Sequence, residues 1–247
     1  MDTLRAVVLA AGKGTRLASE QSDLPKVMRC ALGQPLLAYV LSAIDFIEKR
    51  NTLLVVGYKK EKVTEAFPEY PCAVQTEQLG TGHAVMAARD ALSGYSGHLL
   101  VCYGDMPLVR RETYRALVET HIAQGNDCTI LTGTSDLPLP YGRVIRDEAG
   151  SFVRVVEDRD CTPDEARVRE LNSGVYMFSA PVLLSALGAL KRSNTQGEYY
   201  ITDVPAVLCE QGKRVGLCKR ELQEEILGVN TPAQLQQVES ALARRVR

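Results

Sequence analysis

Short apolar segments rich in β-branched residues alternate along this chain with longer segments whose apolar residues recur every three or four positions. The short segments have the composition of buried strands, and the longer ones have the periodicity of amphipathic helices. Such alternation favours a parallel sheet, because two parallel strands need a long crossover between them, and a helix usually provides it. The sequence therefore predicts an α/β fold of Rossmann-like type, with a mostly parallel sheet and helices on both of its faces.

The same pattern gives the approximate bounds of the elements. We expect strands over residues 4–10, 52–57, 72–75, 98–103, 127–132 and 171–179. We expect helices over residues 35–49, 59–67, 82–92, 110–124, 181–191 and 232–244. Residues 143–146 and 152–156 flank the turn sequence Asp147-Glu148-Ala149-Gly150 and predict a small antiparallel hairpin beside the sheet. No internal repeat or flexible linker divides the chain, so residues 1–247 are expected to form a single domain.

Charge and hydropathy exclude several classes of protein. With 29 Lys and Arg against 30 Asp and Glu, the formal charge is −1, and no net charge attracts nucleic acid or an anionic membrane. The apolar run from Ala6 to Ala11 is too short for a signal peptide. The uncharged stretch from Leu171 to Leu190 is interrupted by Ser, Asn, Gly and Pro, as in a strand followed by a helix. We therefore expect a soluble, cytoplasmic protein that binds neither nucleic acid nor a membrane.

The seven cysteines are scattered, and none belongs to a C-x-x-C pair. This arrangement argues against a zinc site or a disulfide framework and fits a reducing compartment. Cys72, Cys102 and Cys128 lie in short apolar runs, where a free thiol behaves as a small apolar side chain. We expect these three in the core.

The first predicted strand leads into the sequence Leu9-Ala10-Ala11-Gly12-Lys13-Gly14-Thr15-Arg16. Small residues and two glycines at the carboxyl end of a strand let backbone N–H groups approach phosphate oxygens, and Lys13 and Arg16 add positive charge. The loop is not a Walker A sequence, because Val7 stands where glycine is needed, nor a dinucleotide fingerprint, because Leu17 replaces the third glycine. Alone, such a loop fits a structural turn as well as a phosphate site.

A second motif, Ser22-Asp23-Leu24-Pro25-Lys26, places a lysine after a proline that stiffens the chain. Together the two motifs resemble the signature of sugar-nucleotide pyrophosphorylases, which join a sugar 1-phosphate to a nucleoside triphosphate. Six further motifs follow in the order of that family: QTEQLGTGHA at 75–84, YGDMPL at 103–108, YGRV at 141–144, ELNSGV at 170–175, GEYYITD at 197–203 and GVNT at 228–231. Over roughly residues 4–235 the chain resembles the uridylyltransferase domain of the bifunctional bacterial enzyme of UDP-N-acetylglucosamine synthesis (GlmU type).

The resemblance implies the nucleotide-diphospho-sugar transferase fold and transfer of uridylyl from UTP to N-acetylglucosamine 1-phosphate, which would supply a precursor of peptidoglycan. It implies that Arg16 and Lys26 are catalytic and that Mg²⁺ is held by Asp105 and Asn230. The nucleotide-binding residues implied are Leu9, Ala10, Ala11, Gly12, Lys26, Gln75, Gly80 and Thr81. The sugar-binding residues implied are Tyr103, Gly104, Gly142, Glu157 and Asn172, with Tyr199, Tyr200 and Thr202 at the border of the pocket.

Several of these residues also suit their implied roles on chemical grounds. Asp105 follows an apolar strand, at the edge where α/β proteins bind ligands, and Mg²⁺ needs only one or two protein oxygens beside phosphates and water. The amide of Gln75 offers a donor and an acceptor to a uracil edge. Taken singly, Asp105 fits a turn or helix cap, Asn230 fits the start of a helix and Glu157 fits a charged turn. His83 is expected to be structural.

Two departures from the family pattern affect the prediction. The segment Leu17 to Gln21 makes the spacing between Arg16 and the S-D-L-P-K motif a few residues longer than usual. The chain ends 17 residues after Asn230, so we expect no β-helix acetyltransferase domain and a monomer or weak dimer. Three alternatives stay open: another sugar 1-phosphate or nucleotide (UTP or dTTP with glucose 1-phosphate), a non-catalytic sugar-nucleotide sensor, and a nicotinamide oxidoreductase.

Overall fold

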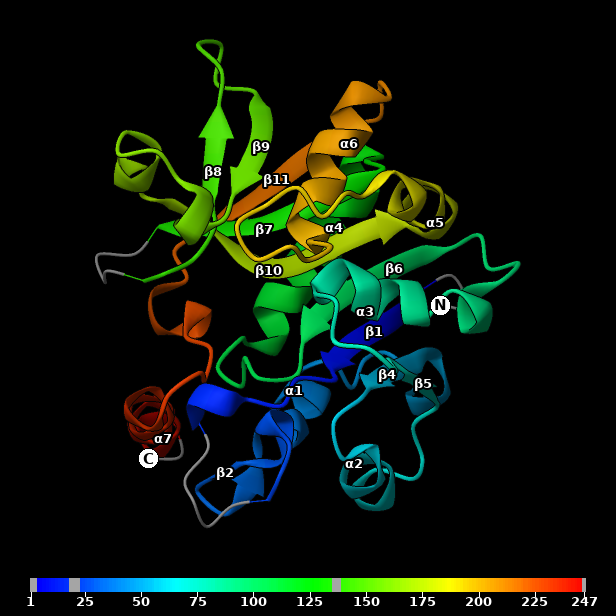
Figure 1. Cartoon of the computed structure of the whole chain (residues 1–247), viewed down its shortest axis with the longest axis vertical. Helices are drawn as coiled ribbons and strands as arrows, with labels where there is room; N and C mark the ends of the chain where they lie inside the picture. Colours follow the sequence, from blue (N-terminus) through cyan, green and yellow to red (C-terminus); the bar gives the residue numbers. More distant parts are fainter. Residues whose placement is uncertain (1–3, 18–22, 135–138, 246–247) are drawn as a thin grey trace.

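A nine-stranded sheet forms the centre of the molecule in the computed structural model, which describes residues 4–17, 23–134 and 139–245 (Figure 1). Seven strands follow the order β11-β7-β10-β6-β1-β4-β5. Their bounds are β1 Leu4–Ala10, β4 Thr52–Val56, β5 Cys72–Val74, β6 His98–Tyr103, β7 Cys128–Thr134, β10 Glu170–Ser179 and β11 Val215–Arg220. Along this path only β10 runs antiparallel to its neighbours, so the sheet is mostly parallel, as predicted.

The predicted hairpin is present with the predicted bounds: β8 spans Arg143–Arg146 and β9 spans Phe152–Val156. It projects from one end of the sheet, at the top of Figure 1, where β8 pairs with β10. A separate two-stranded sheet, which the sequence pattern did not indicate, joins β2 Cys30–Ala31 to β3 Gln34–Pro35. It lies near α7 at the opposite end of the molecule.

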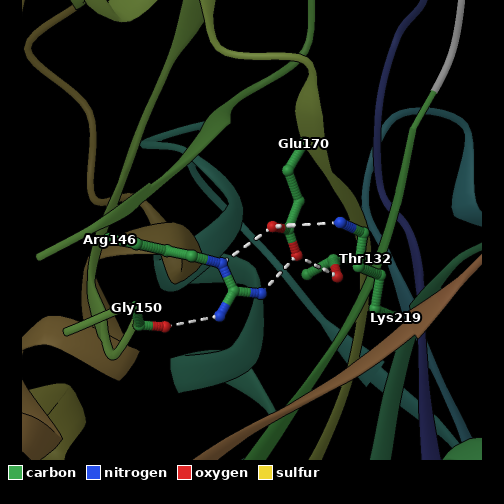
Figure 2. A network of polar contacts seen from close by, with 5 residues as sticks. All are labelled: Thr132, Arg146, Gly150, Glu170 and Lys219. Carbon is green, nitrogen blue, oxygen red and sulfur yellow. Dashed lines mark hydrogen bonds and ion pairs between the residues drawn. The ribbon is translucent and has the colours of Figure 1, made fainter. Parts of the chain in front are cut away.

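Glu170 ties the hairpin to the sheet (Figure 2). Arg146 of β8 donates to its carboxylate through Nε at 2.9 Å and Nη2 at 2.8 Å, and Thr132 of β7 donates at 2.7 Å. Lys219 of β11 lies 3.9 Å from the same carboxylate, while Arg146 Nη1 donates to the Gly150 carbonyl of the hairpin turn. Burial raises the pKa of Glu170, but the hydrogen bonds from Arg146 and Thr132 outweigh burial and lower it. One ionised carboxylate therefore connects four strands.

Seven α-helices in the described part of the chain cover the sheet, and they pack on both faces as predicted. Their bounds are α1 Leu36–Ala43, α2 Lys60–Ala66, α3 Thr81–Ala87, α4 Arg111–Gln124, α5 Ala180–Ala186, α6 Val204–Glu210 and α7 Pro232–Arg245. Buried residues of α1, α2, α4 and α7 share one apolar core, whereas those of α3, α5 and α6 share the other. Alternate residues of β1 enter the two cores, because side chains alternate along a strand: Val8 packs on one face and Val7 on the other.

Some predicted bounds were wrong. The helix expected over 35–49 ends at Ala43, although Ile44 and Ile47 are buried in turns that keep a helix-like spacing of apolar residues. The sequence pattern also missed α6 and β11. Strand β11 lies at the edge of the sheet with Cys218 as its one buried residue, so it lacks the apolar run that marks a central strand.

The cysteines follow the position of their strands. Cys102 and Cys128 are buried on the inner strands β6 and β7, as expected. Cys72 is exposed, contrary to expectation, because β5 is the other edge strand of the sheet. Within the described part of the chain, no helix is both long enough and apolar enough to cross a bilayer.

Candidate active site

A cleft of about 580 Å³ lies at the edge of the sheet where the parallel strands end. The residues that follow β1, β5 and β6 line it, as do Glu157 after β9 and Thr81 at the start of α3. Because β10 runs in the opposite direction, it reaches this edge with its first residues, among them Asn172. The cleft brings together all the predicted site residues except Ala10, Gly104, Tyr199 and Thr202.

The glycine-rich loop packs closely against Lys26. Gly14 adopts a positive φ of 69°, and a Cβ at this position would lie 2.8 Å from Cβ of Lys26. The Lys26 amide donates to the Gly12 carbonyl at 3.4 Å. Arg16 follows in the 3₁₀ turn Thr15–Leu17 and lines the cleft. Lys13 is exposed, with its ammonium 5.3 Å from the ring centre of Tyr58. The longer segment noted in the sequence falls largely on residues 18–22, outside the described residues.

Lys26 contacts both predicted metal ligands. Its ammonium forms an ion pair with the Asp105 carboxylate and donates a 2.7 Å hydrogen bond to Oδ1 of Asn230. The Lys26 and Asp105 side chains are only 15% and 18% exposed, so their interaction is weakly screened by solvent. A carboxylate oxygen and an amide oxygen thus converge on one cation at one end of the cleft.

This pair of oxygens suits a magnesium ion. Mg²⁺ is commonly bound by one or two carboxylates, with water and substrate phosphates completing its six ligands. In the part of the chain that the structure describes, no group of three or more His, Cys, Asp or Glu side chains is arranged to hold a metal. The donor set therefore fits an ion that arrives with a nucleotide better than a metal fully enclosed by protein.

On the side of the cleft where β5 ends, Gln75 is held in one orientation. Its side chain is 5% exposed, and its Nε2 lies 3.1 Å from the Gly80 carbonyl and 3.2 Å from Nδ1 of His83. Gly80 has a φ of 105°, and a Cβ there would lie 2.6 Å from the Tyr199 carbonyl, so this approach requires glycine. His83 does not line the cleft and contacts Gln75 instead, which agrees with a structural role.

On the opposite side, Asn172 is 6% exposed and is held by short polar contacts. Its Nδ2 donates to the Tyr176 hydroxyl at 2.7 Å, and its Oδ1 accepts from the Gly174 backbone amide at 3.2 Å. The backbone amide of Asn172 donates to the Gly142 carbonyl at 2.8 Å. Gly174 has a positive φ, and a Cβ there would clash with the ring of Tyr103. The irregular pairing of β10 between Asn172 and Tyr176 thus makes room for the Tyr103 ring beside the cleft.

Glu157 contributes a carboxyl group with a raised pKa to this side of the cleft. Burial raises the pKa of Glu157, and the neighbouring carboxylates of Asp203, Asp160 and Asp158 raise it further. Burial likewise raises the pKa of the Tyr103 phenol well above its usual range. These groups and Asn172 place several hydrogen-bonding side chains along this side of the cleft.

Four predicted residues lie outside the cleft lining. Ala10 is 1% exposed and points into the core on the face opposite to Leu9. A Cβ at Gly104 would lie 3.1 Å from side-chain atoms of both Leu37 and Val27, so packing covers this residue. Tyr199 and Thr202 are also absent from the lining, whereas Tyr200 is part of it.

Sequence reasoning overlooked several lining residues, among them Gln78, Tyr141, Gln196 and Gln234. Gln78 and Tyr141 belong to motifs quoted above, and Gln78 donates to the Ala11 carbonyl at 2.8 Å. Gln234 follows Thr231 by three residues, which is the spacing of a capping box. That spacing was a signal for a polar side chain turned back toward Asn230.

Comparison with known proteins shows the family to which the chain is similar. A model of the nucleotidyl transferase family matches residues 5–223. The bifunctional protein GlmU of Streptococcus thermophilus is 43% identical over 242 residues, which make up 98% of this chain and 52% of that protein. The bifunctional protein GlmU of Pelobacter propionicus is 43% identical over 249 residues, covering 100% of this chain and 54% of that protein. The chain thus spans about half the length of these curated relatives.

A solved structure shares the fold. A Bacillus anthracis protein described as a glucose-1-phosphate thymidylyltransferase, crystallised with sucrose, superposes with a TM-score of 0.73. The match covers 98% of this chain and 95% of that chain at 18% sequence identity. At this identity the similarity supports the fold alone.

Proposed function

The chain belongs to the nucleotidyl transferase family, and we propose that it transfers the uridylyl group of UTP to N-acetylglucosamine 1-phosphate, releasing pyrophosphate and forming UDP-N-acetylglucosamine. One observation carries the proposal: a single cleft joins a cluster of Lys26, Asp105 and Asn230 to a pocket containing Glu157 and Asn172. The first group suits phosphates with a divalent cation, and the second suits the hydroxyl and amide groups of a sugar. The relatives named bifunctional protein GlmU match this chain along its full length and support the same substrates.

In the reaction, a phosphate oxygen of the sugar 1-phosphate attacks the α-phosphorus of UTP. The bond from that phosphorus to the oxygen bridging it to the β-phosphate breaks, and pyrophosphate leaves with the bonding electrons. The protein contributes positioning and neutralisation of charge, because phosphoryl transfer requires little covalent chemistry from it. Arg16 and Lys26 supply positive charge beside the reacting phosphates.

Enzymes of this family generally use a divalent metal ion. We propose that the ion is Mg²⁺ and that Asp105 and Asn230 hold it. Bound there with the nucleotide, it would neutralise charge on the phosphates. Asp105 supplies the anionic oxygen and Asn230 the neutral one, and both already face one cation, the Lys26 ammonium.

We propose that one side of the cleft selects the nucleotide and the other side selects the sugar. Gln75, oriented by Gly80 and His83, would read the uracil edge, and the N-terminal end of α3 at Thr81 adds backbone N–H groups. Glu157 and Asn172 would pair with the sugar. A site with buried polar groups rejects a substrate that leaves them unpaired, at about 1 to 3 kcal/mol for each group. The free thiols fit a cytoplasmic location.

The test is pyrophosphate release from each of UTP, dTTP, ATP and GTP with either N-acetylglucosamine 1-phosphate or glucose 1-phosphate, in Mg²⁺. We expect UTP with N-acetylglucosamine 1-phosphate to give the highest kcat/KM. A higher value for dTTP or glucose 1-phosphate would assign the enzyme to another substrate pair. Binding of UDP-N-acetylglucosamine without turnover of any pair would indicate a sensor.

A further inference from the structure

We propose that Tyr141 is a positioning residue that fixes the metal ligand Asn230 and connects it to the sugar side of the cleft, an inference that rests on the proposed function. Tyr141 lines the cleft, and it immediately precedes Gly142 on the sugar side. Its phenol reaches the segment that carries Asn230. Three observations support this role.

The first observation is that the segment 228–230 has no regular secondary structure and is held by its three backbone amides. The Gly228 amide donates to the Tyr141 hydroxyl at 2.7 Å. The Val229 amide donates to the Asp105 carbonyl at 3.0 Å, and the Asn230 amide donates to Oε1 of Gln234 at 2.8 Å. Tyr141 is the one of these three partners that comes from the sugar side, since Asp105 follows β6 and Gln234 belongs to α7.

The second observation is the tight fit between the phenol and Gly228. A Cβ at Gly228 would lie 3.3 Å from the Tyr141 hydroxyl oxygen, closer than most side chains tolerate. Glycine therefore allows the short hydrogen bond. Burial raises the pKa of Tyr141 to about 12, partly offset by the hydrogen bond from Gly228, so the hydroxyl stays neutral near pH 7.

The third observation is that the backbone of Tyr141 is itself anchored. The Arg143 side chain, 11% exposed, donates to the carbonyl of Tyr141 and, at 3.3 Å, to that of Leu139. Its other terminal nitrogen lies 3.1 Å from Oδ1 of Asp158, the residue after Glu157. Arg143 thus fixes the backbone of Tyr141 relative to the segment after Glu157. The Tyr141 phenol in turn links both to Gly228 through its hydrogen bond.

This geometry predicts a specific loss in Tyr141→Phe. Without the hydroxyl, the Gly228 amide loses its acceptor. The segment carrying Asn230 then keeps only two of the three hydrogen bonds that its backbone amides donate. Metal affinity is expected to fall by up to about tenfold, since the loss of one hydrogen bond between neutral groups is of that order. Tyr95→Phe is a matched control, because Tyr95 is also half-buried and donates one hydrogen bond at 3.0 Å to a backbone carbonyl, that of His98. Tyr95 does not line the cleft.

The experiment measures Mn²⁺ binding by electron paramagnetic resonance in saturating UTP, together with amide hydrogen exchange of residues 226–231 in the unliganded protein. We expect Tyr141→Phe to raise the Kd for Mn²⁺ by up to about tenfold and to accelerate exchange in this segment, while Tyr95→Phe changes neither. Equal Mn²⁺ affinity in wild type and Tyr141→Phe, an equal loss in both variants, or no Mn²⁺ binding to the wild type would each overturn the proposal.

Kinetics separate this inference from the proposed function. The Mg²⁺ concentration for half-maximal pyrophosphate release should rise in Tyr141→Phe, and saturating Mg²⁺ should restore most of kcat. If the wild type releases no pyrophosphate from UTP with any sugar 1-phosphate, the proposed function fails, whereas the exchange and Mn²⁺ measurements still decide the role of Tyr141. A wild-type Mg²⁺ requirement in an active Tyr141→Phe variant would contradict the positioning role alone.

Discussion

The ammonium of Lys26 donates a 2.7 Å hydrogen bond to the side-chain oxygen of Asn230, although 204 residues separate the two along the chain. The same ammonium pairs with Asp105. A lysine thus faces both oxygens that we assign to Mg²⁺, and two cations at one place repel each other. We infer that Lys26 keeps Asp105 neutralised before substrates bind and turns toward the phosphates when the metal arrives.

Replacing Lys26 should separate metal binding from turnover. Lys26→Ala removes the cation that competes for Asp105 and Asn230, so Mn²⁺ should bind in the presence of UTP at least as tightly as in the wild type. Turnover should nevertheless fall by about a hundredfold or more, because a charge that stabilises the reacting phosphates is lost. Lys59→Ala is the control, since Lys59 also pairs with an aspartate, Asp23, but does not line the cleft. Weaker Mn²⁺ binding in Lys26→Ala would show that the lysine organises the metal site rather than competing for it.

Asp105→Ala should abolish most activity while leaving the fold intact. The side chain is a proposed metal ligand, and loss of such a ligand at a reacting phosphate is worth several kcal/mol of transition-state stabilisation. The backbone carbonyl of Asp105, which accepts from Val229, remains in the variant. We therefore expect kcat to fall by at least about a hundredfold, with a small change in Tm. Retained activity in this variant, or in the wild type with excess chelator, would remove the metal from the mechanism.

The sequence was sufficient for parts of the molecule whose structure depends on local pattern. The alternation in residues 143–156 predicted the hairpin, and the apolar run before Lys13 predicted β1. The contact between Lys26 and Asn230 was not predictable in this way, because it depends on the packing of residues 228–230 against the end of β6. Likewise, the periodicity of Ile44 and Ile47 indicated helix where the chain forms buried turns, since burial alone does not distinguish the two.

In the site, too, the sequence predicted the types of residue but not the contacts between distant segments. Motifs that resemble the family led us to propose Asp105 and Asn172 by type and order, but partners that orient proposed site residues are distant in sequence. Asn172 is held by Tyr176 and Gly142, and Asn230 by Gln234. The Tyr141 phenol contacts Gly228, 87 residues further along the chain. Which polar groups act together is decided by tertiary packing.

Asn172→Ala should reduce discrimination between sugars. Asn172 is proposed to pair with the substituents of the sugar, so the preference for N-acetylglucosamine 1-phosphate over glucose 1-phosphate, expressed as the ratio of kcat/KM values, should fall by about 1 to 3 kcal/mol. Loss of the bonds to Tyr176 and Gly174 will also lower stability. That loss affects both substrates equally, so the ratio serves as its own control. An unchanged ratio would place sugar recognition on other residues.

Acid should destabilise the protein through His121, which is fully buried between α4 and the sheet. Its Nε2 lies 3.1 Å from Nδ1 of His98, and its Nδ1 lies 3.0 Å from the Thr129 hydroxyl. Burial, and then the neighbouring His98, lower its pKa to about 4, although Asp127 opposes the shift. The folded protein therefore keeps His121 neutral where the unfolded chain, with a histidine pKa of about 6.5, already binds a proton.

The direction of the pH effect follows from this difference. Because the unfolded state binds more protons, the contribution of His121 to the free energy of unfolding is fully present above about pH 6.5 and is lost as the pH falls toward 4. The loss amounts to at most about 3 kcal/mol, at 1.36 kcal/mol per pKa unit.

Asp203 acts in the opposite direction, since burial raises its pKa to about 6, so the comparison must be made between wild type and a variant. In urea unfolding between pH 4.5 and 7.5, His121→Gln should be less stable than the wild type at pH 7.5, with the gap narrowing on acidification. His83→Gln, which removes a histidine outside this network, controls for the replacement of a histidine by glutamine. A constant gap for His121→Gln would mean that the folded protein tolerates a charged imidazole at this position.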